Sequence, residues 1–339
     1  MTLPPLRYEP YDETVGTANV VVDGSPNAGT VLTVSHWPGM PTPPGCAADT
    51  SAEMAFRYLD RGADLHDTAT VVTNNHFDQD GLAGLYALVA PHHAVLRRRQ
   101  LEDLAAAGDF AVYADRSSAR LSMAVAALGD PSRSPVRDLP DEYADACTLL
   151  YRTALELLPG WLDDAESCQS LWGDEDAELE AGLAAVASGA VTIDEDIELD
   201  LAVVTLPPAG RSSGHRFVGR RFAGVHPMAL HRATHRSTIL TIDPADGRHQ
   251  LVCRYEGWVQ FRSRPIRPRV DLRPLADRLT ATETGGAVWR ATSPADLMPE
   301  LQTLATGPAS SLDPPDLRAA VADHLRQAPP AWDPYAVRP

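Results

Sequence analysis

Short apolar runs alternate with helical patterns over the first part of the chain, and together they predict an α/β fold. Residues 19–23, 30–34 and 70–73 are rich in β-branched side chains, which is typical of buried strands. Apolar residues recur at helical spacing over 52–59 and 82–89. This order of strands and helices favours a mostly parallel sheet.

Beyond residue 130 the pattern of apolar and polar residues changes, and it predicts a helical region followed by a second domain. Two long helical patterns come first, and strand patterns at 201–206, 238–242 and 250–255 follow, the last two as a hairpin. We therefore expect an α/β core over residues 1–130, a helical linker or cover over 131–198, a smaller Arg-rich domain over 199–305 and a Pro-rich tail over 306–339.

The strand at 70–73 leads directly into a polar turn that contains His76, Asp78 and Asp80. Alternation along an extended backbone places these three side chains on one side. The turn lies at the carboxyl end of a strand, where open α/β sheets bind ligands. Imidazole and carboxylate groups together suit Mn²⁺, Fe²⁺, Zn²⁺ or Mg²⁺. The alternative is a polar turn in which Asp80 caps the next helix, but a cap accounts for only one of the three residues.

Composition excludes several classes of function. All 29 basic residues are arginine, which excludes a Schiff-base lysine or a Walker lysine. The net charge of −17 opposes binding to long nucleic acids. Four scattered cysteines, no signal peptide and no membrane-spanning run predict a cytoplasmic chain that does not enter a membrane.

The stretch from Asn75 to Gly81 resembles the first motif of the DHH phosphoesterase superfamily, in which a strand runs into an Asp/His-x-Asp-x-Asp-Gly turn and then a helix. Members of that superfamily include single-strand exonucleases, oligonucleotide and cyclic-dinucleotide phosphodiesterases and manganese pyrophosphatases. The resemblance implies a doubly wound, mostly parallel sheet, a two-metal centre and a second, smaller α+β domain. Mn²⁺ is the metal that this resemblance favours.

A second block resembles the Asp-His-His motif that names the superfamily. The strand and turn at 31–37 are similar to it, and residues 49–56 are similar to the helix start that follows it. This block precedes the first motif here, whereas it follows in the superfamily, so the resemblance implies a permuted core. Ser35 and Trp37 replace the first Asp and the last His of the motif.

The resemblance implies a set of candidate metal ligands, which are His36, Asp49, His76, Asp78, Asp80 and Asp115. Asp115 ends a predicted strand over 110–114 and is the candidate for a carboxylate that bridges two ions. His36 and Asp115 are the expected catalytic residues. Simpler roles stay open, because His36 could be a loop histidine, Asp49 a helix cap and Asp115 a turn residue.

Arginine forks suit phosphate oxygens because they donate parallel hydrogen bonds. The candidates for binding a substrate phosphate are Arg216, Arg220, Arg221, Arg264, Arg267 and Arg269. An ordinary surface in an Arg-biased composition is the alternative.

We therefore expect a metal-dependent phosphoesterase that hydrolyses a small phosphoester or a short oligonucleotide through a metal-activated water. One alternative is a metalloenzyme with a His/carboxylate site that acts on a non-phosphate substrate. Another is a non-catalytic binding protein on a degenerate DHH scaffold, which the replacements at Ser35 and Trp37 favour.

Overall fold

The computed structural model describes residues 4–61, 69–207, 215–217, 220–222, 224–304 and 306–337, without the side chains of 215–217 and 220–222. The chain forms two compact units. In the described part, the first unit runs to Ala177 and also includes Gln260–Arg264, and the second comprises Glu178–Val259 and Pro265–Val337. None of the helices in these ranges combines the length and apolar character needed to cross a membrane.

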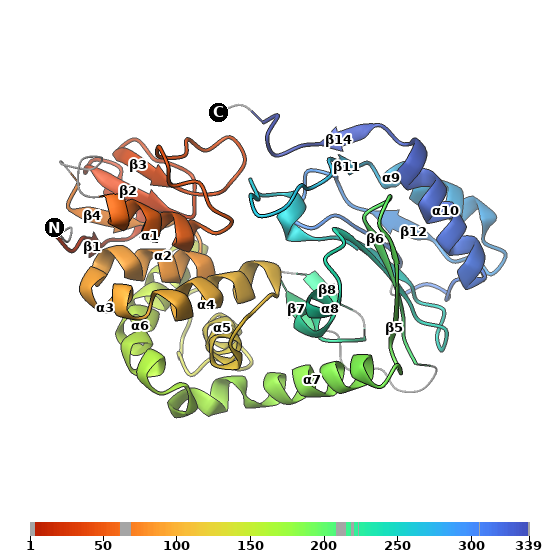
Figure 1. The fold of residues 1–339 in the computed structure, drawn as a ribbon, viewed down its shortest axis with the longest axis horizontal. Helices are drawn as coiled ribbons and strands as arrows, with labels where there is room; N and C mark the ends of the chain where they lie inside the picture. Colours follow the sequence, from red (N-terminus) through yellow and green to blue (C-terminus); the bar gives the residue numbers. More distant parts are fainter. Residues whose placement is uncertain are drawn as a thin grey trace. The chain divides into compact units, whose positions relative to one another are not determined.

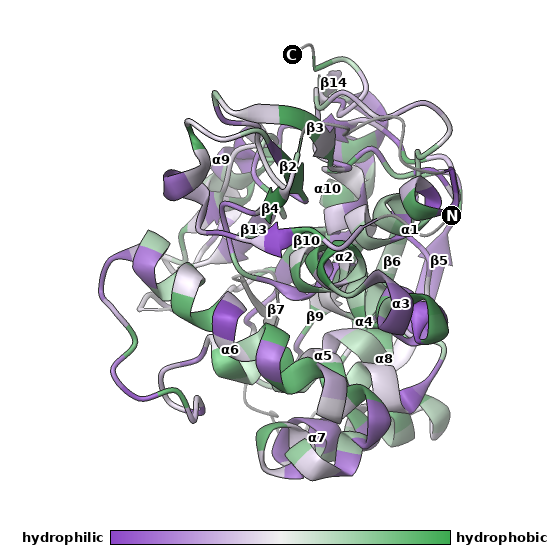
Figure 2. Cartoon of the chain, turned by 90° about the vertical axis from the view of Figure 1, so that its left-hand side faces the viewer, coloured by the Kyte–Doolittle hydropathy of each residue, from purple (hydrophilic) through white to green (hydrophobic). Residues whose placement is uncertain are grey.

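The first unit contains a four-stranded sheet in which every neighbouring pair is parallel, in the order β1-β4-β2-β3. The strands are β1 (Arg7–Tyr8), β2 (Asn19–Val22), β3 (Thr30–Val34) and β4 (Val71–Thr73). The residues of β2 and β4 are all buried, as the β-branched runs predict, and Figure 2 colours both strands hydrophobic. The predicted α/β class with a mostly parallel sheet is therefore confirmed for this unit.

Helices α1 (Ser51–Arg61) and α2 (Gln79–Val89) pack on the strands and on each other, and Figure 1 shows them beside the sheet. The other helices of this unit are α3 (Pro91–Leu96), α4 (Arg98–Phe110), α5 (Arg116–Leu128) and α6 (Tyr143–Asp163). Helix α4 packs on α2, and α5 packs on α4 and α6. The expected boundary at residue 130 thus falls inside this unit.

One predicted strand is wrong. Residues 110–114 do not form a strand, because Phe110 is the last residue of α4 and Ala111 leaves the helix in a left-handed conformation with φ of 52°. Apolar side chains at a helix end and in the following turn can form a short run like that of a buried strand.

The second unit is built around a six-stranded mixed sheet in the order β12-β13-β10-β9-β6-β5. Its strands are β5 (Thr192–Asp196), β6 (Leu201–Thr205), β9 (Thr238–Ile242), β10 (Gln250–Cys253), β12 (Trp289–Ala291) and β13 (Glu300–Thr303). The pair β6–β9 is parallel and the other neighbours are antiparallel. The predicted hairpin of β9 and β10 is confirmed.

Helices α9 (Arg273–Thr282) and α10 (Pro314–Gln327) cover this sheet (Figure 1). Leu317 and Val321 of α10 belong to the same hydrophobic core as Leu240 and Leu251, so the region expected as a Pro-rich tail is largely part of the second unit. The remaining elements are α7 (Gln169–Ala187), α8 (Pro227–Ala233), the ribbon of β7 (His215–Phe217) and β8 (Arg220–Phe222), and the pair of β11 (Arg269–Val270) and β14 (Pro330–Trp332).

Candidate metal centre

Three parallel strands of the first unit end beside one another, and a polar residue follows each of them. Asp23 follows β2, His36 lies two residues beyond β3, and His76 lies in the loop after β4. Because parallel strands place their carboxyl ends at one edge of the sheet, these side chains meet there. Side chains from three separate stretches of the sequence therefore lie close together in space.

Asp23 lies between the two histidines. Its Oδ1 is 3.4 Å from Nε2 of His36, and its Oδ2 is 3.3 Å from Nε2 of His76. The side chain is buried, and the hydroxyl of Ser51 donates a hydrogen bond of 2.8 Å to Oδ1. Asp23 adopts a left-handed backbone with φ of 50°, which is uncommon for a residue with a side chain. Each oxygen of its carboxylate thus faces a different histidine.

The first group of candidate ligands is buried and surrounds His36. Nε2 of His36 lies 3.4 Å from Asp23, 3.7 Å from Oδ2 of Asp80 and 3.5 Å from Oδ2 of Asp109. Nδ1 of His36 contacts the backbone carbonyl of Asp49, which can only accept, so Nδ1 carries the proton. Nε2 therefore faces the three carboxylates, and a ring oriented through Nδ1 in this way is common in histidine–metal sites.

Asp80 also supports the start of α1. Its two carboxylate oxygens accept hydrogen bonds of 2.7 Å from the backbone amides of Ser51 and Ala52. Each carboxylate oxygen has two lone pairs, so these bonds leave acceptor capacity on the side that faces His36. Asp80 thus caps a helix, as the simpler interpretation expects, but the helix is α1 and the carboxylate still faces the centre.

The second group, formed by Asp23, His76 and Asp78, is more exposed. Nε2 of His76 lies 2.9 Å from Oδ2 of Asp78, and the two side chains are 20% and 29% exposed, against 1% or less for Asp23, His36 and Asp80. The ring of Trp37 packs on His76 at a centroid distance of 5.1 Å. Asp78 also caps α2 by accepting a hydrogen bond from the amide of Gly81. A ligand from solvent would reach this group more readily than the buried one.

The buried carboxylates of the cluster repel one another, and bound cations would offset their negative charges. Burial, together with the charges of Asp23 and Asp78, raises the pKa of Asp80 well above its ordinary range despite the two backbone hydrogen bonds. Burial and the carboxylates of Asp80, Asp78 and Asp23 raise the pKa of Asp109 in the same way. Asp109 also lies in the last turn of α4, where the helix dipole disfavours a negative charge.

The pKa of the histidine between the carboxylates is also raised, but for a histidine this favours the charged form. Burial lowers the pKa of His76, but the charges and hydrogen bonds of Asp78 and Asp23 outweigh burial and raise this pKa well above its ordinary value. Burial also opposes ionisation of Asp23, yet its contacts with His76, His36 and Ser51 lower its pKa. Without metal, a protonated His76 thus supplies the positive charge that ions would supply when bound.

The residues fit divalent ions in type and spacing. Two ligand atoms that each lie about 2.0–2.2 Å from one ion are themselves roughly 3.0–3.5 Å apart, which matches most of the distances around His36 and Asp23. Oδ2 of Asp109 is buried and meets no hydrogen-bond donor of the described residues. A mixed set of imidazole and carboxylate ligands suits Mn²⁺, Fe²⁺ or Zn²⁺.

Two of the predicted ligands have other roles. The carboxylate of Asp49 accepts hydrogen bonds from the amides of Arg262 and Ser263, so it holds the Gln260–Arg264 segment and lies outside both groups. Its contribution to the centre comes from its backbone carbonyl. Asp115 is exposed and caps α5 through the amide of Ser117, because the strand that was expected to carry it inward does not exist. The expected catalytic and bridging role of Asp115 is therefore wrong.

Two residues of the centre were missed by sequence reasoning. Asp23 follows the run 19–22 as directly as the polar turn follows 70–73, so the rule that found His76 would also have found it. Asp109 lies inside a helix and becomes a candidate only when α4 packs on α2, and we see no local pattern that marks it.

The predicted phosphate arginines do not form one group. Arg264 lies in the first unit, where its guanidinium packs over the ring of Phe261, which in turn contacts Phe110 beside Asp109. Arg216, Arg220 and Arg221 lie in the β7–β8 ribbon, and their side chains are outside the described part of the chain.

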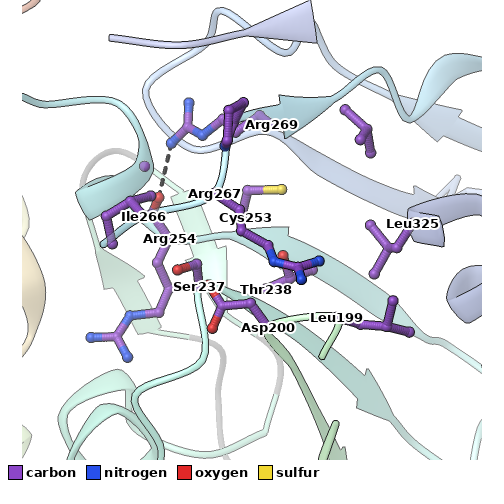
Figure 3. A pocket seen from close by; sticks show the side chains of 13 residues that line it. Leu199, Asp200, Ser237, Thr238, Cys253, Arg254, Ile266, Arg267, Arg269 and Leu325 are labelled. Carbon is purple, nitrogen blue, oxygen red and sulfur yellow. Dashed lines mark hydrogen bonds between the residues drawn. The ribbon is translucent and has the colours of Figure 1, made fainter. Parts of the chain in front are cut away.

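Arg267 and Arg269 line a pocket of the second unit (Figure 3). The guanidinium of Arg269 is buried and donates to four backbone carbonyls, those of Arg254, Pro294, Asp296 and Leu297. Burial lowers the pKa of Arg269 to about 10. Arg269 is thus a structural residue of this unit, and its prediction as a phosphate ligand is wrong.

Among curated proteins and solved structures, none matches the chain. The model of a family of unknown function, DUF6687, matches residues 4–336. A match of this length covers nearly all of both units, and the chain belongs to this family.

Proposed function

We propose that this chain is a divalent-metal-dependent phosphoesterase with a two-ion centre at the carboxyl edge of its parallel sheet. The observation that carries the proposal is the position of Asp23, which turns one carboxylate oxygen to His36 and the other to His76. A shared carboxylate of this kind is the feature that two-metal hydrolases use to hold their ions close together. The doubly wound, DHH-like arrangement and its permuted order are part of the same proposal.

The two groups of ligands would have different tasks. The buried group of Asp23, His36, Asp80 and Asp109 would hold an ion away from solvent. The more exposed group of Asp23, His76 and Asp78 would leave positions open for substrate and water. When bound, the ions would acidify a coordinated water and offset the charge of a phosphoryl group.

The chain's own residues would orient the ligands and help to bind the substrate. The carbonyl of Asp49 keeps Nε2 of His36 directed at the carboxylates. Arg264 is our candidate for a contact to the substrate phosphate, because its segment is held by Asp49 and its guanidinium belongs to the same unit. The net charge of −17 favours a small phosphoester or a short oligonucleotide over a long nucleic acid.

The test is Mn²⁺-dependent hydrolysis of a panel of small phosphoesters and short oligonucleotides. We expect turnover by the wild type, loss of turnover in Asp23→Asn, and unchanged turnover in Asp115→Asn, a matched change at an exposed helix cap. Equal activity in the wild type and Asp23→Asn would contradict the proposal. A filled centre without turnover would instead favour a metalloenzyme for a non-phosphate substrate, or a binding protein.

A further inference from the structure

The two histidines of the centre are held in different ways. His36 is oriented through its ring, because Nδ1 donates to the carbonyl of Asp49. Nδ1 of His76 is buried and has no hydrogen-bond partner among the described residues. Apart from the contacts of Nε2 with Asp78 and Asp23, the position of the His76 ring depends on its contact with Trp37 and on the backbone that carries it.

Tyr151 holds that backbone. It lies in α6, is fully buried, and donates a hydrogen bond of 2.6 Å from its hydroxyl to the carbonyl oxygen of His76. The ring of Phe77 packs edge-on against Tyr151 at a centroid distance of 5.0 Å. The loop that carries His76 and Asp78 is thus held by a residue that lies 75 positions further along the sequence.

The groups that hold His76 pack closely against Gly81. A Cβ placed on Gly81 would lie 2.5 Å from the Tyr151 hydroxyl and 2.3 Å from the side-chain amide of Asn74. The carboxamide oxygen of Asn74 in turn accepts a hydrogen bond from the amide of His76. Gly81 therefore allows Tyr151 and Asn74 to approach the start of α2 and to hold both the N–H and the C=O of His76.

We propose that Tyr151 is a positioning residue for the more exposed half of the centre, and that it sets the affinity of that half for its ion. This inference rests on the proposed two-ion centre. The buried half has its own support in Asp49 and does not depend on Tyr151. Removing the Tyr151 hydroxyl should therefore weaken ion binding in the more exposed half and leave ion binding in the buried half unchanged.

The experiment measures Mn²⁺ binding by titration calorimetry, together with the electron paramagnetic resonance of the bound ion, in the full chain. In Tyr151→Phe we expect binding at the more exposed group to lose affinity by about 10-fold or more, the range for residues that orient metal ligands, while binding at the buried group is unchanged. Tyr86→Phe is the matched control. Tyr86 is also buried, and its hydroxyl makes a hydrogen bond of 2.6 Å to His93, away from the centre.

A purely structural role for Tyr151 would change binding at both groups together, or at neither, and would overturn the inference. Phe77→Leu removes the edge-on contact that supports Tyr151 but keeps the Tyr151 hydroxyl. A loss of Mn²⁺ affinity at the more exposed group alone would support the inference even if Tyr151→Phe folds poorly. If both variants bind Mn²⁺ at both groups with wild-type affinity, the inference about Tyr151 is overturned, but the two-ion centre is not. A wild type that binds no Mn²⁺ would overturn the centre and the inference together.

Discussion

At the scale of single residues, the surroundings of a carboxylate decide whether it can bind metal. Asp80 and Asp115 both cap helices, but Asp80 is buried and faces His36, whereas Asp115 is exposed and accepts a hydrogen bond from the amide of Ser117. The sequence correctly predicted that His36, His76, Asp78 and Asp80 follow the carboxyl ends of strands, because β-branched runs indicate where strands end. It could not separate Asp115 from a ligand, since burial depends on packing.

Replacing Asp78 and replacing Asp80 should therefore have different effects on metal binding and on stability. Asp78→Ala should abolish binding at the more exposed group only, whereas Asp80→Ala should abolish binding at the buried group. Asp80→Ala should also lower the free energy of unfolding by about 1–3 kcal/mol, because two buried amides of α1 lose their acceptor. Metal titration and urea unfolding measure both effects, and Asp115→Ala controls for the loss of an ordinary cap. Full metal binding by the Asp78→Ala/Asp80→Ala double variant would contradict this assignment.

The raised pKa values of Asp80, Asp109 and His76 predict that metal affinity rises with pH. All three groups hold protons more tightly in the metal-free protein than they would in isolation, so an entering ion must displace protons. As the pH rises toward these raised pKa values, fewer protons compete and the affinity for Mn²⁺ should increase. Calorimetry in buffers of different ionisation enthalpy measures the protons released. Binding without proton release between about pH 6 and about pH 8 would contradict the account.

At the scale of elements, the centre depends on contacts that cross the chain. Asp80, in the first turn of α2, caps α1, and Tyr151 of α6 holds the loop after β4. The Gln260–Arg264 segment lies far along the sequence, yet it belongs to the first unit. Local patterns predicted most strands and helices, but they could not predict these contacts. The wrong strand at 110–114 has the same cause, because a buried helix end and a buried strand share one apolar pattern.

Asp49→Ala should release the Gln260–Arg264 segment without emptying the centre. The variant removes the acceptor of the Arg262 and Ser263 amides but keeps the backbone carbonyl that orients His36. We expect these two amides to exchange hydrogen about 10-fold faster or more, equivalent to about 1–3 kcal/mol, with Mn²⁺ stoichiometry unchanged. Hydrogen exchange with mass spectrometry measures the first effect. Loss of metal with unchanged exchange would show that Asp49 acts as a ligand after all.

At the scale of the whole molecule, the candidate ligands belong to the first unit, and the second unit has its own hydrophobic core around β9, β10, α9 and α10. The division into two parts was expected, but the extent of each was not. The expected boundary at residue 130 separates α6 from the first unit, and the expected tail separates α10 from the second unit, because packing decides which core a helix joins.

Removal of metal should consequently destabilise the first unit selectively. An ion that binds only the folded state stabilises that state against unfolding. The gain is on the order of 3 kcal/mol when the free ion is at about 100 times its dissociation constant. A chelator should therefore accelerate hydrogen exchange in β2 and β4, while β9 and β10 stay protected. Equal loss of protection in both units would contradict this assignment of the metal to one unit.

The most direct test of the account is the metal content of the purified chain after Mn²⁺ loading and removal of free ions. The two groups of ligands around Asp23 predict up to two ions per chain in the wild type, and they predict that Asp23→Asn, which keeps the shape of the side chain, loses both. Asp115→Asn should bind as the wild type does. A wild type without metal, or an Asp23→Asn variant that retains the wild-type content, would contradict the central claim.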